Sequence, residues 1–199
     1  MTPIKCTSIN LANGAHNRDS MIALEKPNDN YGASSFAFVS GGTGTNPALP
    51  QQALFKFDFS AIPAGATILN AGLALNQTNT GVATLNVHKI TGVWDEATVT
   101  WNSFGGAFDP AIVKSFSTAS ATVNVDVLPL VQGWLSGAIP NNGLLIEGPG
   151  ASVAKFKTHE YGVAAQQPSI NLCYKVICAA GTADCDGNAQ NGCETSTNS

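Results

Sequence analysis

The segment Ala53-Leu54-Phe55-Lys56-Phe57-Asp58-Phe59 alternates apolar and polar side chains from Phe55 onward, so three phenylalanines share one face. A period of two indicates a β-strand with one buried face. Similar alternation occurs at 68–76, 84–88 and 123–127, and less strictly at 21–24, 36–39, 143–147, 153–158 and 169–176. Turn-forming clusters at 41–44, 62–65 and 140–143 separate these runs. Many short strands between such turns predict an all-β protein, a β-sandwich.

One segment departs from this pattern. Residues 128–136 carry apolar side chains at helical spacing. Asp126 precedes them as a cap, Pro129 suits a first turn, and Gly137 suits the end of a helix. We therefore predict one short helix that closes an end of the sandwich, with Trp134 in the core.

The composition excludes several classes of protein. Charged residues make up 11% of the 199-residue chain and hydrophobic residues 44%, whereas disordered chains combine high net charge with low hydrophobicity. The net charge is −4 and Arg18 is the single arginine, so the basic surplus of nucleic-acid binders is missing. No run of about eighteen apolar residues occurs. We expect neither a nucleic-acid partner nor a membrane span.

The C-terminal end differs from the rest of the chain. From Cys178 onward it consists largely of Gly, Ala, Asp, Asn and Cys, without apolar alternation. Such a segment cannot bury a core, which predicts a β-sandwich domain over 1–177 and a disulfide-held tail over 178–199. Low charge, abundant Asn, Ser and Thr, and cysteines without zinc-site spacing indicate a secreted protein with disulfides.

Several motifs follow one another in a distinctive order. They are RDSMI at 18–22, PNDNYG at 27–32, LFKFDFSAIPAG at 54–65, WDEATVTWN at 94–102, LVQGWLSG at 130–137, NNGLLI at 141–146, FKTHE at 156–160 and PSINL at 168–172. Over about residues 18–176 the chain thus resembles the DNRLRE, or disaggregatase-related, domains. These are extracellular jelly-roll modules, some of them carbohydrate-binding. The family often has arginine where this chain has His159 and Gln167. The tail resembles short Cys-rich segments of secreted myxobacterial-type proteins, which implies export.

A jelly roll often places its first and last strands side by side, so we expect Cys6 to pair with Cys173. Alternation along 169–176 directs Cys173 to the outer face, where an N-terminal segment can cross it. The expected tail disulfide joins Cys185 and Cys193, which leaves Cys178 as the odd cysteine, free or intermolecular.

Period-two alternation also assigns faces to side chains. Within 68–76 it puts Leu69, Ala71, Leu73 and Leu75 inward. The candidate ligand-binding cations that it sends outward are Lys56, His88, Lys155 and Lys157. On strands that a jelly roll brings together, these cations can hold carboxylate-bearing sugars through charge-assisted hydrogen bonds. The alternative is an ordinary solvated sheet face.

Trp94 and Trp101 are a second candidate, because aromatic rings stack on the apolar faces of sugars. The alternative is that they seal an edge of the sandwich, anchored by a strand at 98–100. The neighbouring carboxylates Asp95 and Glu96 point to opposite sides of an extended chain, unlike a glycosidase pair. With no G-x-S-x-G motif either, we predict that the protein is not an enzyme.

An oxygen-rich set suggests a metal. It consists of Asp19, Asn28, Asp29, Asn30 and Glu160. Calcium takes roughly six to eight oxygen ligands, and the jelly-roll resemblance implies a structural calcium ion. The alternative is turn chemistry, since Asn-Asp-Asn before Tyr-Gly suits a tight turn.

Two functions follow from these observations. The first is a secreted, non-catalytic carbohydrate-binding module whose partner is an acidic polysaccharide. The second is a structural or adhesive protein of an extracellular matrix or filament, which implies self-assembly. Low charge, abundant Gly and Ala, and the Cys-rich tail suit the second equally well.

Overall fold

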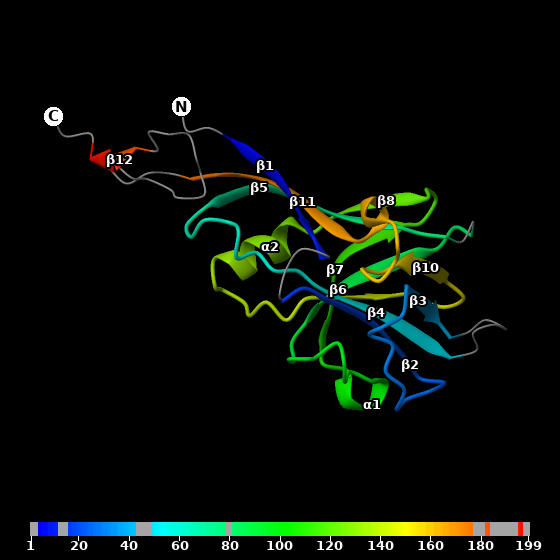
Figure 1. The fold of residues 1–199 in the computed structure, drawn as a ribbon. Coiled ribbons are helices and arrows are strands. Elements are labelled where there is room, and N and C mark those ends of the chain that lie inside the picture. The colour runs from blue at the N-terminus through cyan, green and yellow to red at the C-terminus, as the bar shows by residue number, and fades with distance from the viewer. Residues whose placement is uncertain are drawn as a thin grey trace.

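The computed structural model describes residues 4–11, 16–42, 49–78 and 81–176, and the strand backbone at 182–183 and 195–196. Two antiparallel sheets form its body (Figure 1). The four-stranded sheet has the order β1 (Lys5–Asn10), β11 (Ser169–Lys175), β5 (Thr67–Asn76) and β8 (Thr122–Asp126). The larger sheet has the order β10 (Val153–Lys157), β3 (Phe36–Gly41), β4 (Pro50–Lys56), β9 (Leu144–Glu147), β6 (Thr84–Ile90) and β7 (Phe108–Ser117), and β2 (Arg18–Ala23) also pairs with β4.

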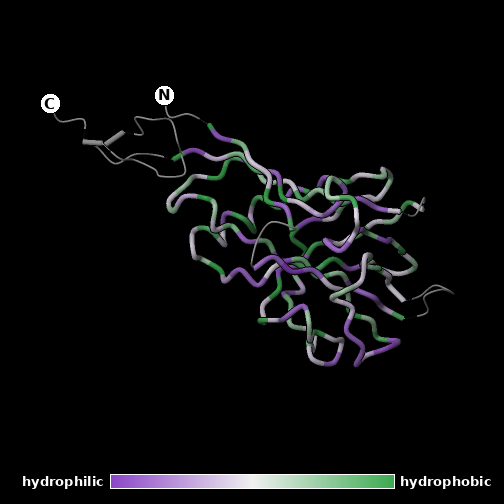
Figure 2. Tube along the Cα trace, viewed as in Figure 1, coloured by the Kyte–Doolittle hydropathy of each residue, from purple (hydrophilic) through white to green (hydrophobic). Residues whose placement is uncertain are grey.

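The main core lies between the two sheets. Phe55 and Phe57 on one side pack with Leu73, Leu75 and Tyr174 on the other, and all five are nearly or fully buried. Figure 2 shows hydropathy changing repeatedly along the strands rather than dividing the chain into apolar and polar segments. Each fully buried large side chain contributes about 1.5–3 kcal/mol through removal from water. The predicted all-β sandwich is confirmed.

A β-bulge in β5 corrects one predicted face. Cys173 pairs with Asn70, but the next residue, Tyr174, pairs with Ile68, so Leu69 is an extra residue in β5. Alternation is therefore shifted by one position before Asn70. Ile68 is inward and only 4% exposed, whereas Leu69, which strict alternation places inward, is 37% exposed.

Two strands escape the sequence pattern. β7 is an edge strand with exposed or half-buried side chains along its whole length, so it lacks apolar alternation, and it contains Pro110. β1 is the edge of the other sheet and buries one of its six side chains, Ile9. Edge strands need no continuous apolar face, which explains why composition alone does not reveal them.

The predicted helix is confirmed as α2 (Leu128–Leu135). Its N-cap residue is Val127, but Asp126 Oδ1 accepts a hydrogen bond from the backbone N–H of Leu128 at 3.0 Å. Gly137, just beyond the helix, has a left-handed φ of 74°, which suits a helix end. Trp134 is buried, with its ring centroid 5.8 Å from that of Phe59.

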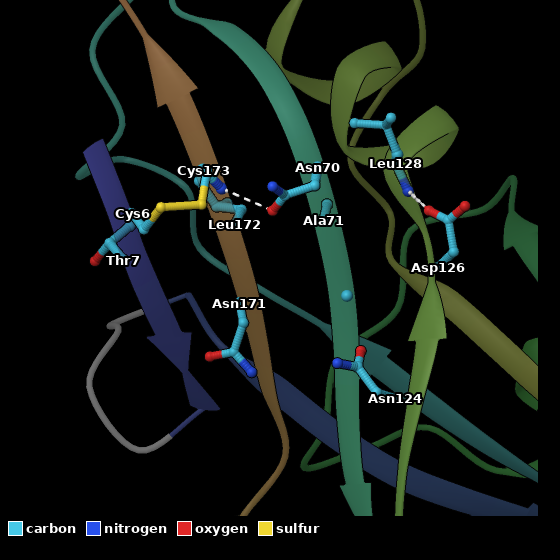
Figure 3. Close-up of a pocket in the computed structure, with 11 residues that line it drawn as sticks. Cys6, Thr7, Asn70, Ala71, Asn124, Asp126, Leu128, Asn171, Leu172 and Cys173 are labelled. Atoms are coloured by element: carbon cyan, nitrogen blue, oxygen red, sulfur yellow. Dashed lines mark hydrogen bonds between the residues drawn. A yellow bond between two sulfur atoms is a disulfide. The ribbon is translucent and has the colours of Figure 1, made fainter. Parts of the chain in front are cut away.

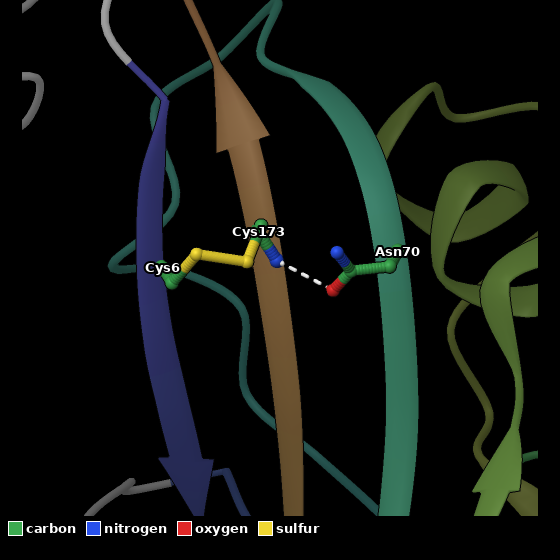
Figure 4. The surroundings of a disulfide bond; sticks show 3 residues. All are labelled: Cys6, Asn70 and Cys173. Atoms are coloured by element: carbon green, nitrogen blue, oxygen red, sulfur yellow. Dashed lines mark hydrogen bonds between the residues drawn. A yellow bond between two sulfur atoms is a disulfide. The ribbon is translucent and has the colours of Figure 1, made fainter.

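The predicted disulfide between Cys6 and Cys173 is confirmed, and it joins residues 167 positions apart in the sequence (Figure 4). The two cysteines lie directly opposite each other in the β1–β11 ladder. The predicted Cys185–Cys193 disulfide and the odd Cys178 lie outside the described residues. In the tail, β12 (Thr182–Ala183) pairs with β13 (Thr195–Ser196), and the domain boundary at 177 stays a prediction.

A second apolar cluster covers the outer face of the larger sheet. Ile22, Leu54 and Leu145 point outward from β2, β4 and β9 and pack against Trp94 and Phe104. The latter two belong to the segment 91–107, which contains the four-residue helix α1 (Trp101–Phe104). The larger sheet is therefore buried on both faces over its centre. None of the helices in the described ranges has the length and apolar character needed to cross a membrane.

Candidate functional site

The covering segment 91–107 decides which predicted site residues a ligand can reach. The predicted strand at 98–100 is wrong, because Thr100 instead caps α1. Thr100 Oγ1 accepts a hydrogen bond from Ser103 N at 3.1 Å, and Ser103 Oγ accepts one from Thr100 N at 2.9 Å. This reciprocal capping ends the extended chain.

Trp94 is a structural residue rather than a platform for sugar rings. It is 8% exposed, and its indole N–H donates to the Asn142 carbonyl at 2.8 Å. Trp101 is half-buried and lines a small hollow of about 320 Å³ with Ile22, Gln52 and Phe104 among others. Of the two tryptophans, only Trp101 has exposed surface of any size.

His88 points away from the main core as predicted, but it is not solvent-exposed. It is 2% exposed, because Phe108 lies edge-on to it with ring centroids 5.2 Å apart. Its Nε2 lies 3.1 Å from Glu147 Oε1, and its Nδ1 lies 3.0 Å from the Asp109 carbonyl oxygen. The placement of His88 on a ligand-accessible face is therefore wrong.

Lys56 lies apart from the other predicted cations. It is at the end of β4 that pairs with Arg18 of β2, whereas β3 pairs with the opposite end of β4. Partial burial lowers the pKa of Lys56, and the nearby Arg18 charge lowers it further. The four predicted cations therefore do not form one cluster.

Lys155 and Lys157 do share one face of β10, on which both side chains are half-buried. They alternate on β10 with the buried Ala154 and Phe156 and oppose Phe38 and Phe36 of β3. Lys155 Nζ lies 3.8 Å from the centroid of the Phe36 ring and 5.1 Å from that of Phe38.

Tyr161 completes this surface. Its ring centroid lies 5.6 Å from that of Phe36 and 4.4 Å from Lys157 Nζ, which also donates to Gln166 Oε1. We name the half-buried set Phe36, Phe38, Lys155, Lys157 and Tyr161 the aromatic–lysine face. Sequence reasoning found its lysines but missed its rings, although alternation within 36–39 already separates Phe36 and Phe38 from Ala37 and Val39.

A second cluster joins three distant segments. Asp19 from β2, Glu96 from the covering segment and His159 and Glu160 beyond β10 bring their ligand atoms within 4.8 Å of one another. His159 Nδ1 lies 3.1 Å from Asp19 Oδ1 and 3.4 Å from Glu96 Oε1, and His159 Nε2 lies 3.0 Å from Glu160 Oε1. Backbone N–H groups bind the same carboxylates, from Asp19 to Glu96 at 3.0 Å and from His159 to Asp19 at 2.9 Å. We name these four residues the carboxylate–histidine cluster.

A family model decides the class of the protein. The model for carbohydrate-binding module family 96 matches residues 11–172, which spans most strands of both sheets. The chain belongs to this family. No curated protein matches the chain. Membership of family 96 indicates a binding module rather than a catalytic domain, and both the aromatic–lysine face and the carboxylate–histidine cluster lie within the matched range.

In this family 96 module the carboxylate–histidine cluster is a set of internal ion pairs between His159 and the three carboxylates. Hydrogen bonds to the Asp19 and Glu160 carboxylates raise the pKa of His159 to about 10. Burial raises the pKa of Asp19 to about 6, although its hydrogen bond to His159 opposes the rise. At neutral pH an imidazolium ring therefore lies among three carboxylates and ties β2 to the covering segment.

The predicted calcium ligands divide between two places. Asp19 and Glu160 belong to the cluster, whereas Asn28 and Asn30 bind the covering segment. Asn30 Nδ2 donates to the carbonyls of Glu96 and Val99, both at 2.8 Å, and Asn28 Oδ1 accepts from Asn102. Asp29 is also elsewhere, 4.0 Å from Lys26 Nζ.

The cluster itself does not fit calcium. Calcium prefers roughly six to eight oxygen ligands, but one of these four side chains offers ring nitrogen. The positive charge of that ring, which lies in contact with all three carboxylates, offsets part of their charge and repels a cation. Calcium in this family 96 module stays a prediction, tested by whether the ion raises the unfolding temperature.

Proposed function

We propose that the protein is a secreted, non-catalytic module that binds an acidic polysaccharide through the aromatic–lysine face. The observation that carries the proposal is the position of Lys155 and Lys157 on one half-buried strand face, the side of β10 that points away from the core. Two residues along a strand span about 7 Å, so the ammonium groups form a short row. A polymer with repeated carboxylates can pair with such a row through charge-assisted hydrogen bonds.

The aromatic rings of this face lie beneath the lysine ammonium groups, which favours charge attraction over sugar stacking on the rings as the source of affinity. Lys155 Nζ lies over the Phe36 ring and Lys157 Nζ over the Tyr161 ring. Cation–π contacts of this kind contribute about 0.5–1 kcal/mol at exposed sites and hold the ammonium groups in place. Because the ammonium groups cover these ring faces, a neutral sugar gains little from stacking there. An acidic sugar gains from charges that are already positioned.

The double variant Lys155→Ala/Lys157→Ala is expected to bind polygalacturonate or alginate roughly three- to tenfold more weakly than the wild type. Exposed charge pairs contribute up to about 1 kcal/mol each, and a tenfold change corresponds to about 1.4 kcal/mol. Retardation in native gels that contain the polymer measures this change. Raising the salt concentration is expected to weaken binding by the wild type, since exposed charges are screened over about 8 Å at physiological ionic strength.

The matched control is Lys26→Ala/Lys114→Ala, which removes the same charge from exposed positions outside the aromatic–lysine face. This control is expected to keep most of the retardation. Equal retardation of Lys155→Ala/Lys157→Ala and the wild type, or binding that is indifferent to salt, would contradict the proposal. Absence of binding to every polymer, together with concentration-dependent light scattering, would favour a self-assembling structural protein instead.

A further inference from the structure

A groove crosses the outer face of the four-stranded sheet. The strands β3 and β10, which carry the phenylalanines and lysines of the aromatic–lysine face, belong to the larger sheet. The volume of the groove is about 770 Å³, within the range typical of ligand sites. Figure 3 shows side chains from neighbouring strands lining it, with the Asn70 amide hydrogen-bonded to Cys173. The lining residues are Cys6 and Thr7 of β1, Asn171, Leu172 and Cys173 of β11, Asn70, Ala71 and Gly72 of β5, Asn124 and Asp126 of β8, and Leu128 of α2.

Amide side chains dominate the polar lining of this groove. Asn124 and Asn171 are exposed, and within the described ranges their side chains make no hydrogen bond. Asn70 Oδ1 accepts from Cys173 N at 3.1 Å, which leaves its NH₂ group for a ligand. An amide offers both a donor and an acceptor, as a sugar hydroxyl does. The amides therefore match a hydroxyl-rich ligand without requiring any charge on it.

Charge in the groove disfavours an acidic ligand. Its lining contains no lysine or arginine, and its single ionisable side chain outside the disulfide is Asp126. Asp126 uses Oδ1 to accept the N–H of Leu128 and keeps a negative charge near the groove. A carboxylate-bearing polymer would meet repulsion here and attraction at the aromatic–lysine face, so the two surfaces differ in the sugars that they suit.

Gly72 and the disulfide shape the groove. A Cβ atom at position 72 would lie 2.2 Å from Asn124 Oδ1, so glycine lets the Asn124 amide lie close over β5. The Cys6–Cys173 disulfide joins β1 to β11 along one wall (Figure 4). A wall that is already fixed loses less conformational freedom when a ligand binds.

We propose that this groove is a second glycan site, which binds a neutral, hydroxyl-rich polysaccharide chain through Asn70, Asn124 and Asn171. The site extends the module beyond acidic polymers, and it does not depend on the aromatic–lysine face. Each of β11, β5 and β8 contributes one amide to the groove. Asn171 lies opposite Gly72, Asn70 precedes Gly72 by two residues, and Asn124 lies opposite Ala74, so the three amides are spread along the strands as well as across them.

The variant Asn124→Ala/Asn171→Ala tests this site, because it removes amides that hold no described part of the fold. Retardation of the wild type and the variant is compared in gels that contain mixed-linkage β-glucan, galactomannan or xylan, with polygalacturonate as the acidic comparator. We expect the wild type to be retarded by at least one neutral polymer and the variant to bind it at least about tenfold more weakly, through loss of two hydrogen-bonding groups. Retardation on polygalacturonate is expected to stay unchanged.

Two further variants separate the groove from the aromatic–lysine face. Gly72→Val fills the floor of the groove and pushes the Asn124 amide aside, because its Cβ would lie 2.2 Å from Asn124 Oδ1. The displaced group is the end of an exposed side chain and valine suits a strand, so the variant is expected to weaken binding of the neutral polymer with little loss of stability. Lys155→Ala/Lys157→Ala is expected to leave binding of the neutral polymer unchanged. No retardation of the wild type by any of the neutral polymers would overturn the proposal. The proposal would also be overturned if Asn124→Ala/Asn171→Ala and Gly72→Val both bound the neutral polymer as tightly as the wild type. It would be overturned as well if these two variants bound only polygalacturonate more weakly.

Discussion

Replacing His159 by alanine is expected to destabilise the module by about 3 kcal/mol at pH 7. The change removes the cation that contacts the carboxylates of Asp19, Glu96 and Glu160, and Asp19 is fully buried. Breaking a buried pair from one side costs roughly 3–5 kcal/mol, and the partial exposure of His159 favours the lower end. The unfolding temperature is expected to fall by about 6–12 °C, measured by circular dichroism or calorimetry.

Two control variants separate charge from packing in this experiment. His159→Arg places a cation at this position again and is expected to recover most of the stability that His159→Ala loses. Arginine is also the residue that the resembling domains often carry here. Asp19→Asn in the His159→Ala background removes the uncompensated buried charge and is expected to be more stable than His159→Ala alone. Equal stability of His159→Ala and the wild type would contradict the ion-pair interpretation. An increase in stability on adding calcium to the wild type would instead support a metal in the cluster.

Stability is expected to fall as the pH rises from about 4 to 10. The folded pKa of His159, about 10, lies above its ordinary value of 6.5, so its contribution is complete below pH 6.5 and is lost as the pH rises through 10. The folded pKa of Asp19, about 6, lies above 3.8, so proton binding favours the folded state below pH 3.8 and ceases to do so above 6. Between pH 7 and 10 the unfolding temperature of His159→Arg is expected to change less than that of the wild type, which thermal scans at successive pH values test.

Alternation predicted those parts of the fold in which each strand buries one face against the main core. The inward direction of Phe55, Phe57, Leu85 and Val87 followed from a period of two, and so did the outward direction of Cys173. The helix at 128–135 followed from signals local to the chain. These inferences succeeded because the physics that decides them acts between near neighbours in sequence.

The covering segment could not be predicted in this way. Alternation predicts that the His88 side chain points away from the main core, but it does not predict that Phe108, the first residue of β7 just after the covering segment, packs on it. The same limit applies to Glu96, whose contact with His159 depends on the path of a loop between distant strands. The extra residue at Leu69 shifts the inward face of β5 by one position. This shift could not be predicted, because a bulge leaves no apolar pattern of its own in the sequence.

Removing the disulfide through Cys6→Ser/Cys173→Ser is expected to cost about 3 kcal/mol of stability. The bond closes a loop between residues 167 positions apart, and losing a native disulfide typically costs about 2–5 kcal/mol. β1 depends on the bond especially, because it is an edge strand that pairs with β11 alone. The unfolding temperature is expected to fall by about 6–12 °C, and the backbone amides of β1 are expected to lose protection from hydrogen exchange before those of β5.

The matched control is Cys178→Ser/Cys185→Ser/Cys193→Ser, which leaves the β1–β11 disulfide intact and is expected to keep the wild-type unfolding temperature. Reductant should then lower the stability of this control to that of Cys6→Ser/Cys173→Ser. Equal unfolding temperatures for Cys6→Ser/Cys173→Ser and the wild type would contradict the assigned role. Because Cys6 and Cys173 line the groove, losing their bond is also expected to weaken retardation by the neutral polymer while leaving retardation by polygalacturonate intact. A free β1 would have to be ordered again each time a glycan binds, whereas β10 and its lysines belong to the other sheet.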